Sequence, residues 1–93
     1  MILTIDIGNS NIVIGVFNNE KLMQSWRLRT RLHQGIDEYE MLIRGMIFAC
    51  NFSLEETKGA ILSSVVPDLT DVFSKLIENM IGQQPIKVSN ELF

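Results

Sequence analysis

Residues 1–17 read MILTIDIGNSNIVIGVF, and this stretch decides the fold. Ile2–Ile7 predicts a strand, because apolar residues at positions 3, 5 and 7 alternate with Thr4 and Asp6. Ile12–Phe17 is almost entirely apolar and mostly β-branched, which predicts a central strand covered on both faces. The polar residues 8–11 therefore form a turn between two buried strands.

A third strand follows closely. Asn18-Asn19 predicts a turn, since asparagine tolerates positive φ. Residues from Lys21 to about Arg29 predict a strand, and even spacing places three apolar side chains on one face: Leu22, Trp26 and Leu28. Two tight connections in succession predict an antiparallel meander. Gly15, inside the second strand, indicates a close approach by a neighbour.

The spacing of apolar residues changes from every second to every third or fourth position at Asp37–Cys50, which predicts a helix. Its predicted buried face consists of Tyr39, Leu42, Ile43, Met46, Ile47 and Cys50. Asp37 is expected to cap this helix together with Glu40, and Ile36 is expected to pack on Met41. Glu40 and Arg44 form a favourable i,i+4 pair.

The remaining elements alternate. Ser53 and Glu56 predict a short capped turn, and Ala60–Val65 predicts a fourth strand. A second helix is expected to begin at Pro67 and end at Gly82. Its predicted buried face consists of Leu69, Val72, Phe73, Leu76, Ile77, Met80 and Ile81. Ile86–Val88 predicts a fifth strand, and Ser89–Phe93 is expected to begin another connection.

The order is thus β-β-β-α-β-α-β, which predicts an α/β fold with one mixed sheet and helices on its faces. The strand at Ile2–Ile7 is expected in the middle of the sheet. This is the ribonuclease H-like core found in the actin, hexokinase and Hsp70 superfamily.

Composition narrows the classes of protein. The chain has 93 residues, 46% of them apolar, which suits one compact domain. A net charge of −3 argues against a nucleic-acid partner, and no apolar run reaches the roughly 20 residues of a membrane span. No export signal is recognisable, and the single Cys50, expected in the core, fits a reducing compartment. We therefore expect a cytoplasmic protein.

Arg27, Arg29, Arg31 and His33 share one side if the chain is extended there. The favoured interpretation is a solvated face of an edge strand. The alternative is a patch that faces an anion.

The turn after Asp6 has a chemistry of its own. Gly8 allows close approach of the backbone, and the side chains of Asn9, Ser10 and Asn11 can donate hydrogen bonds to phosphate oxygens. A carboxylate beside a phosphate site makes sense if a cation such as Mg²⁺ lies between them. The alternative is an ordinary hairpin in which Asp6 bonds turn amides, and the six residues alone do not separate the two.

The chain resembles the type III pantothenate kinases, the bacterial family related to the Bvg accessory factors. The matching stretches, in order, are Thr4–Asn11 with Ile12–Phe17, Trp26–Leu28, Asp37–Tyr39 and Ser63–Pro67. The first resembles the family's phosphate-binding motif, with Ser10 where the family usually has threonine.

The resemblance implies an ATP-dependent kinase that converts pantothenate to 4'-phosphopantothenate in coenzyme A biosynthesis. It implies Mg²⁺ with ATP, a monovalent cation (K⁺ or NH₄⁺) and a homodimer. It assigns the ATP phosphates to Asp6–Val13, and Asp6 would organise the magnesium. These eight residues are Asp6, Ile7, Gly8, Asn9, Ser10, Asn11, Ile12 and Val13.

The chain also departs from the family. Members are more than twice as long, and their catalytic aspartate lies in a Gly-x-Asp-Arg motif. Here Gly35-Ile36-Asp37 is followed by Glu38, so no catalytic residue is assigned. Residues 1–93 are expected to be an N-terminal ATP-phosphate-binding domain, truncated before the catalytic segment and inactive alone.

Two alternatives stay open: a nucleotide-binding or interaction module without catalysis, and another superfamily member such as a sugar kinase or actin-like filament protein. Sugar kinases commonly carry Gly-Gly-Thr after the aspartate, so Gly8-Asn9-Ser10 disfavours them. Ser63 and Ser64 could touch substrate, but the favoured interpretation is that Ser64 and Pro67 set the helix start.

Overall fold

The computed structural model describes residues 1–88, and Ser89–Phe93, where a further connection was predicted, lie outside the described residues. The strands are β1 (Ile2–Ile7), β2 (Asn11–Asn18), β3 (Lys21–Arg29), β4 (Gly59–Ser64) and β5 (Ile86–Val88). The helices are α1 (Ile36–Ala49), a 3₁₀ turn η1 (Leu54–Glu56) and α2 (Pro67–Ile81). None of the helices within residues 1–88 is both long and apolar enough to cross a membrane.

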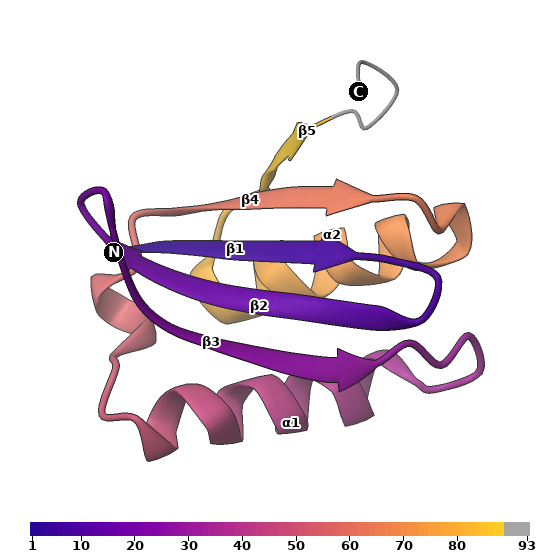
Figure 1. The fold of residues 1–93 in the computed structure, drawn as a ribbon, viewed down its shortest axis with the longest axis horizontal. Coiled ribbons are helices and arrows are strands. Elements are labelled where there is room, and N and C mark those ends of the chain that lie inside the picture. Colours follow the sequence, from indigo (N-terminus) through magenta and orange to yellow (C-terminus); the bar gives the residue numbers. More distant parts are fainter. Residues whose placement is uncertain (89–93) are drawn as a thin grey trace.

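The five strands form one sheet in the order β3-β2-β1-β4-β5. β1, β2 and β3 are antiparallel neighbours, whereas β4 is parallel to both β1 and β5. The predicted mixed sheet, the element order and the central position of β1 are confirmed (Figure 1). The observed bounds of the predicted strands differ by one residue at most.

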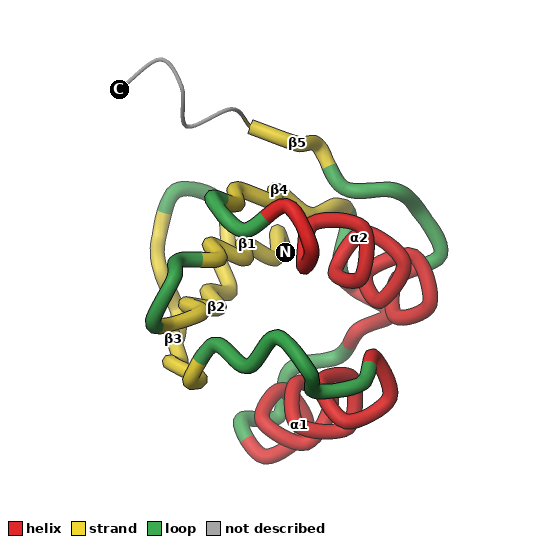
Figure 2. The backbone as a smooth tube through the Cα atoms, turned by 90° about the vertical axis from the view of Figure 1, so that its right-hand side faces the viewer, coloured by secondary structure: helices red, strands yellow, loops and turns green. Residues whose placement is uncertain are grey.

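The core lies on one face of this sheet, which we call the core face. Both α1 and α2 cover it, as Figure 2 shows, and the rings of Tyr39 and Phe73 meet there with centroids 4.9 Å apart. The odd residues of β1 and the even residues of β2 point into this core. The opposite, outer face carries Asp6 and Val13, and no helix among residues 1–88 covers it. The prediction that β2 is covered on both faces is therefore wrong for the described part of the chain.

A β-bulge changes which residues of β3 face the core. Phe17 pairs with Leu22 but Val16 pairs with Gln24, so Met23 is the extra residue. Trp26 lies opposite Ile14 on the core face, as does Leu28 opposite Ile12, whereas Leu22 lies on the outer face, 49% exposed. The prediction that Leu22 shares a face with Trp26 and Leu28 is wrong, because the bulge shifts the alternation by one residue. The predicted turn is confirmed, with Asn19 at φ 57°.

The start of α1 differs from the prediction. Its N-cap is Gly35, no side chain caps it, and the helix already includes Ile36. The proposed contact of Ile36 with Met41 has no support, since Met41 is 77% exposed. Asp37 lies within the first turn instead, where a carboxylate still favours the positive end of the helix dipole.

The buried face of α1 is also narrower than predicted. It consists of Tyr39, Ile43 and Ile47, with Met46 partly buried and Leu42 exposed. Cys50 follows the helix as its C-cap and is only half-buried, with Gln24 Nε2 3.6 Å from its Sγ, so its predicted place in the core is wrong. The predicted Glu40–Arg44 pair is confirmed at 2.7 Å.

The predicted face of α2 is confirmed. Five of its residues are buried and two are partly buried against the core: Leu69, Phe73, Leu76, Ile77 and Met80, then Val72 and Ile81. Pro67 occupies its first turn, and Gly82 ends it in the left-handed region at φ 77°. The short turn predicted near Ser53 is η1, although the Ser53 side chain makes no capping hydrogen bond.

Candidate functional site

Three connections meet at the edge of the sheet where β1 ends, on the right of Figure 1. We call this region the turn edge. The connections are the β1–β2 turn (residues 8–10), the β3–α1 connection (residues 30–35) and the β4–α2 connection (residues 65–66). Thr30 N–H donates to Ser10 O at 3.0 Å, and Val65 N–H donates to Ile7 O at 3.0 Å. The backbone thus ties both neighbouring connections to the segment that follows Asp6. Open α/β sheets bind ligands at this kind of edge.

The turn itself is closed tightly. Gly8 N–H donates to Asn11 O at 2.8 Å. A Cβ at position 8 would lie only 3.1 Å from that same oxygen, so this position suits glycine on grounds of space. The side chains of Asn9, Ser10 and Asn11 are exposed beyond it. The turn therefore presents one hydroxyl and two amides to solvent at the end of the sheet.

Asp6 is exposed on the outer face, between Val13 of β2 and Ser63 of β4 in the sheet register. Within residues 1–88 its carboxylate has no hydrogen bond or ion pair, so the geometry gives no support to a role in bonding turn amides. An unpaired carboxylate can hold a cation, whereas the hydrogen-bond donors beside it suit an anion.

The residues at this edge could hold magnesium in one way, through a single carboxylate. Among the described residues, no three His, Cys, Asp or Glu side chains come together as a metal site. Asp6 would therefore contribute one carboxylate, with water and phosphate oxygens completing the shell, as Mg²⁺ commonly does with nucleotides.

The eight residues predicted to bind ATP are not equivalent. Ile7 and Ile12 are fully buried in the core, so only their backbone atoms can reach a ligand. Val13 is half-buried beside Asp6 on the outer face. The structure brings Asp6, Val13 and the turn together at one edge and turns Ile7 and Ile12 away from it.

A small polar hollow of about 400 Å³ adjoins the turn, lined by Ser10, Asn11, Arg29 and Thr30. Arg29 lies opposite Asn11 at the end of β3, and it is exposed. β3 is an edge strand, as the favoured interpretation of the arginines expects. The strand ends at Arg29, however, so Arg31 and His33 lie in the following connection and do not continue its face. Only Arg29 of this group lines the hollow.

Sequence reasoning missed Thr30. Its hydroxyl donates to Gly8 O at 2.7 Å, and its N–H donates to Ser10 O. The available signal was a polar residue placed directly after a strand that pairs with the turn. Counting along the hairpin would still have failed, because the bulge at Met23 moves the register by one residue.

Ser64 has a local structural role. Its hydroxyl donates to Val66 O and accepts from Val66 N–H, both at 3.1 Å, which shapes the backbone just before α2. Pro67 follows at the start of the helix. This supports the favoured interpretation that these two residues set the helix start.

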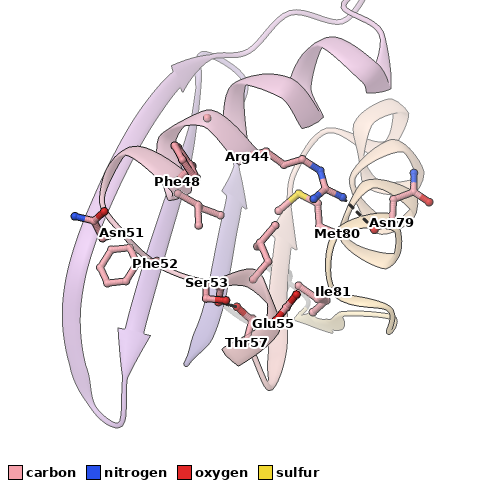
Figure 3. Close-up of a pocket in the computed structure, with 13 residues that line it drawn as sticks. Arg44, Phe48, Asn51, Phe52, Ser53, Glu55, Thr57, Asn79, Met80 and Ile81 are labelled. Carbon is pink, nitrogen blue, oxygen red and sulfur yellow. Dashed lines mark hydrogen bonds between the residues drawn. The ribbon is translucent and has the colours of Figure 1, made fainter.

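A larger groove lies at the other end of the sheet (Figure 3). It measures about 1080 Å³ and lies between the end of α1, η1 and the end of α2. Its arginine, Arg44, is already bonded to Glu40 and to Asn79 O. The groove is far from Asp6, because η1 leads into the residues that pair with the start of β1: Lys58 N–H donates to Met1 O. Its lining also includes polar side chains, among them Glu55, but none of the residues predicted to bind ATP.

Comparison with known families matches this chain almost from end to end. The family model described as type III pantothenate kinase matches residues 2–92. The chain belongs to the type III pantothenate kinase family. A type III pantothenate kinase from Finegoldia magna is 37% identical over 92 residues, which are 99% of this chain and 35% of that protein. Another, from Geobacter sulfurreducens, is 39% identical over 88 residues, 95% of this chain and 34% of that protein.

Solved structures show the same fold. The ROK hexokinase from Thermus thermophilus superposes with a TM-score of 0.68 at 13% identity, over 95% of this chain and 34% of that one. A Ppx/GppA family member from Aquifex aeolicus gives a TM-score of 0.53 at 15% identity, over 98% of this chain and 35% of that one. The predicted ribonuclease H-like fold is thereby confirmed.

This member of the pantothenate kinase family spans about a third of the length of the curated relatives it matches.

Proposed function

We propose that residues 1–93 form the N-terminal ATP-phosphate-binding domain of a longer kinase that transfers a phosphoryl group from ATP to pantothenate. The product would be 4'-phosphopantothenate, in coenzyme A biosynthesis. The observation that carries this proposal is the exposed, unpaired Asp6 carboxylate beside the Gly8–Asn11 turn, in a chain that belongs to the type III pantothenate kinase family.

Each part of the turn edge has a role in this proposal. The backbone N–H groups and polar side chains of residues 9–11 donate hydrogen bonds to phosphate oxygens. Gly8 lets the phosphates approach the backbone closely. Asp6 holds the magnesium that accompanies ATP, and that ion neutralises charge on the phosphates. Val13 borders the carboxylate on the outer face.

The proton acceptor for the pantothenate hydroxyl is not assigned to this chain. A base must lie within hydrogen-bond reach of the hydroxyl it deprotonates, and the family's Gly-x-Asp-Arg motif is absent from these 93 residues. We place that base, the monovalent-cation site and the homodimer contacts in the remainder of the longer protein, which we place in the cytoplasm.

The first prediction concerns the chain alone. Purified residues 1–93 should form no phosphopantothenate from ATP and pantothenate, because the base and most of the electrostatic clamp around the transferred phosphate are missing. The longer protein should form it. Product is measured with radiolabelled pantothenate in the presence of Mg²⁺ and K⁺. Product from the 93-residue chain would refute the division of roles, and a longer protein without product would refute the proposed activity.

A second candidate function is nucleotide binding without turnover. It is favoured by one observation, namely that the closed Gly8–Asn11 turn lies in a chain whose 93 residues lack the Gly-x-Asp-Arg motif. Calorimetric titration of the longer protein with MgATP, combined with the product assay, separates the two functions. Binding without any product supports this second candidate.

A further inference from the structure

We propose that Thr30 is a positioning residue that fixes the phosphate-binding turn in its working geometry. Its two hydrogen bonds reach both sides of the turn. The hydroxyl Oγ1 donates to Gly8 O at 2.7 Å, and the backbone N–H donates to Ser10 O at 3.0 Å. This inference rests on the proposed function of the turn as the ATP-phosphate segment.

The two carbonyls matter because each shares a peptide group with the N–H of the next residue. A peptide group is planar and trans, so the direction of a carbonyl also fixes the N–H of the next residue, which points the opposite way. Holding Gly8 O and Ser10 O against Thr30 therefore directs the N–H groups of Asn9 and Asn11 away from Thr30. Those two groups are among the proposed phosphate donors. Donors that are already oriented bind an anion without the cost of ordering a loop.

Thr30 is itself held in place by contacts that begin in the core. Its neighbour Arg31 is bonded twice by the hydroxyl of Tyr39, which accepts from Arg31 N–H at 2.9 Å and donates to Arg31 O at 2.8 Å. Tyr39 is fully buried, and its ring packs on Phe73. A continuous chain of contacts thus runs from the core through Arg31 and Thr30 to the turn.

The Thr30 hydroxyl is directed at a backbone carbonyl of the turn, and the residue is half-buried. It therefore acts on the bound phosphates through the turn residues Gly8 and Ser10. Loss of the hydroxyl should weaken ATP binding and leave the pantothenate site unaffected.

The test uses Thr30→Val, which keeps the branched shape and removes the hydroxyl, and Thr30→Ser, which keeps the hydroxyl. In the longer protein, Thr30→Val should raise the KM for ATP about three- to tenfold, the loss expected for one hydrogen bond. The KM for pantothenate should stay within about twofold, and Thr30→Ser should stay within about twofold of the parent for both substrates.

The matched control is Thr57→Val. Thr57 is also half-buried and also bonds a backbone carbonyl, Ser53 O, at the other end of the sheet. This control should leave the KM for ATP unchanged. Thr30→Val with an ATP KM like the parent's, or Thr30→Ser as impaired as Thr30→Val, would overturn the inference.

A second measurement separates this inference from the proposed function. In the 93-residue chain, ¹⁵N relaxation reports how rigidly the Asn9 and Asn11 amides are held. Thr30→Val should lower their order parameters, whereas Thr30→Ser and Thr57→Val should not. If the order parameters fall but the longer protein makes no product, the positioning role of Thr30 is supported and the proposed function is refuted. If Thr30→Val leaves the order parameters unchanged, the positioning role of Thr30 is refuted, whether or not the longer protein is active.

Discussion

At the scale of single residues, Gly15 has the least room for a side chain among the glycines of the chain. A Cβ built there would lie 2.7 Å from Thr4 Oγ1 and 3.3 Å from Leu22 Cδ1. Gly15→Ala should therefore lower the free energy of unfolding by about 1–3 kcal/mol, the usual cost of overpacking. Urea denaturation of the 93-residue chain measures this change.

Gly45 provides the matched control. It lies exposed in α1, and a Cβ there would meet nothing within 4 Å. Gly45→Ala should stabilise the protein by about 0.5–1 kcal/mol, because glycine loses more backbone freedom in a helix than alanine does. Combining Gly15→Ala with Thr4→Ala should recover part of the loss, since the colliding oxygen is then gone. A Gly15→Ala protein as stable as its parent would contradict the close contact.

The residues of the candidate site were predictable to different degrees. The turn after Asp6 could be predicted, because glycine and small polar residues lie there between two apolar strands. Its phosphate-binding role came from the family resemblance and stays a prediction. Thr30 could not be predicted. Asn18 pairs with Lys21, and an unbulged ladder would then place Arg29 opposite Ser10. One extra residue at Met23 places Thr30 there instead, and nothing in the local sequence marks that bulge.

At the scale of elements, α1 is joined to the turn edge through Tyr39. This residue carries both a core contact and the two hydrogen bonds to Arg31. Tyr39→Phe keeps the ring but removes the hydroxyl, and it should lower the free energy of unfolding by about 1–2 kcal/mol. Denaturant titration checks this value.

The matched control for Tyr39→Phe is Phe48→Leu. Phe48 lies on the same helix with its side chain 82% exposed, and its replacement should change stability by less than about 0.5 kcal/mol. If Tyr39→Phe were as neutral as Phe48→Leu, the bonds to Arg31 would not contribute to the fold.

Helix ends were less predictable than helix faces. The face of α2 follows from a regular apolar period, and burial of that face outweighs local preferences. The cap of α1 depended on one local pattern at Asp37 and Glu40. The structure instead begins the helix after Gly35, with Tyr39 N–H bonded to Gly35 O, and the burial of Tyr39 in the core agrees with that start.

At the scale of the whole molecule, sheet order followed from connection lengths. Short turns join β1, β2 and β3, and helices join β3, β4 and β5, which leaves few arrangements for five strands. The side of the sheet taken by each helix did not follow. The apolar character of β2 predicts cover on both faces, yet α1 and α2 both lie on the core face (Figure 2). The alternation of apolar and polar residues in β1 predicts which face of that strand is apolar, but it does not predict which helix covers that face.

The central claim is that Asp6 holds the magnesium of bound ATP, and Asp6→Asn in the longer protein tests it most directly. This change keeps the size and one oxygen but removes the charge. Turnover should fall about 10- to 100-fold and its magnesium optimum should move to higher concentration, because the ion loses an anionic partner. Thermal stability should change little, since the carboxylate has no hydrogen bond or ion pair within residues 1–88.

Asp71→Asn, which removes an exposed carboxylate from α2, is the control and should behave like the parent. The deciding measurement is turnover as a function of magnesium concentration for Asp6→Asn, Asp71→Asn and the parent. The account predicts a large loss with a shifted magnesium dependence for Asp6→Asn alone. An Asp6→Asn enzyme with the parent's turnover and magnesium dependence would contradict it.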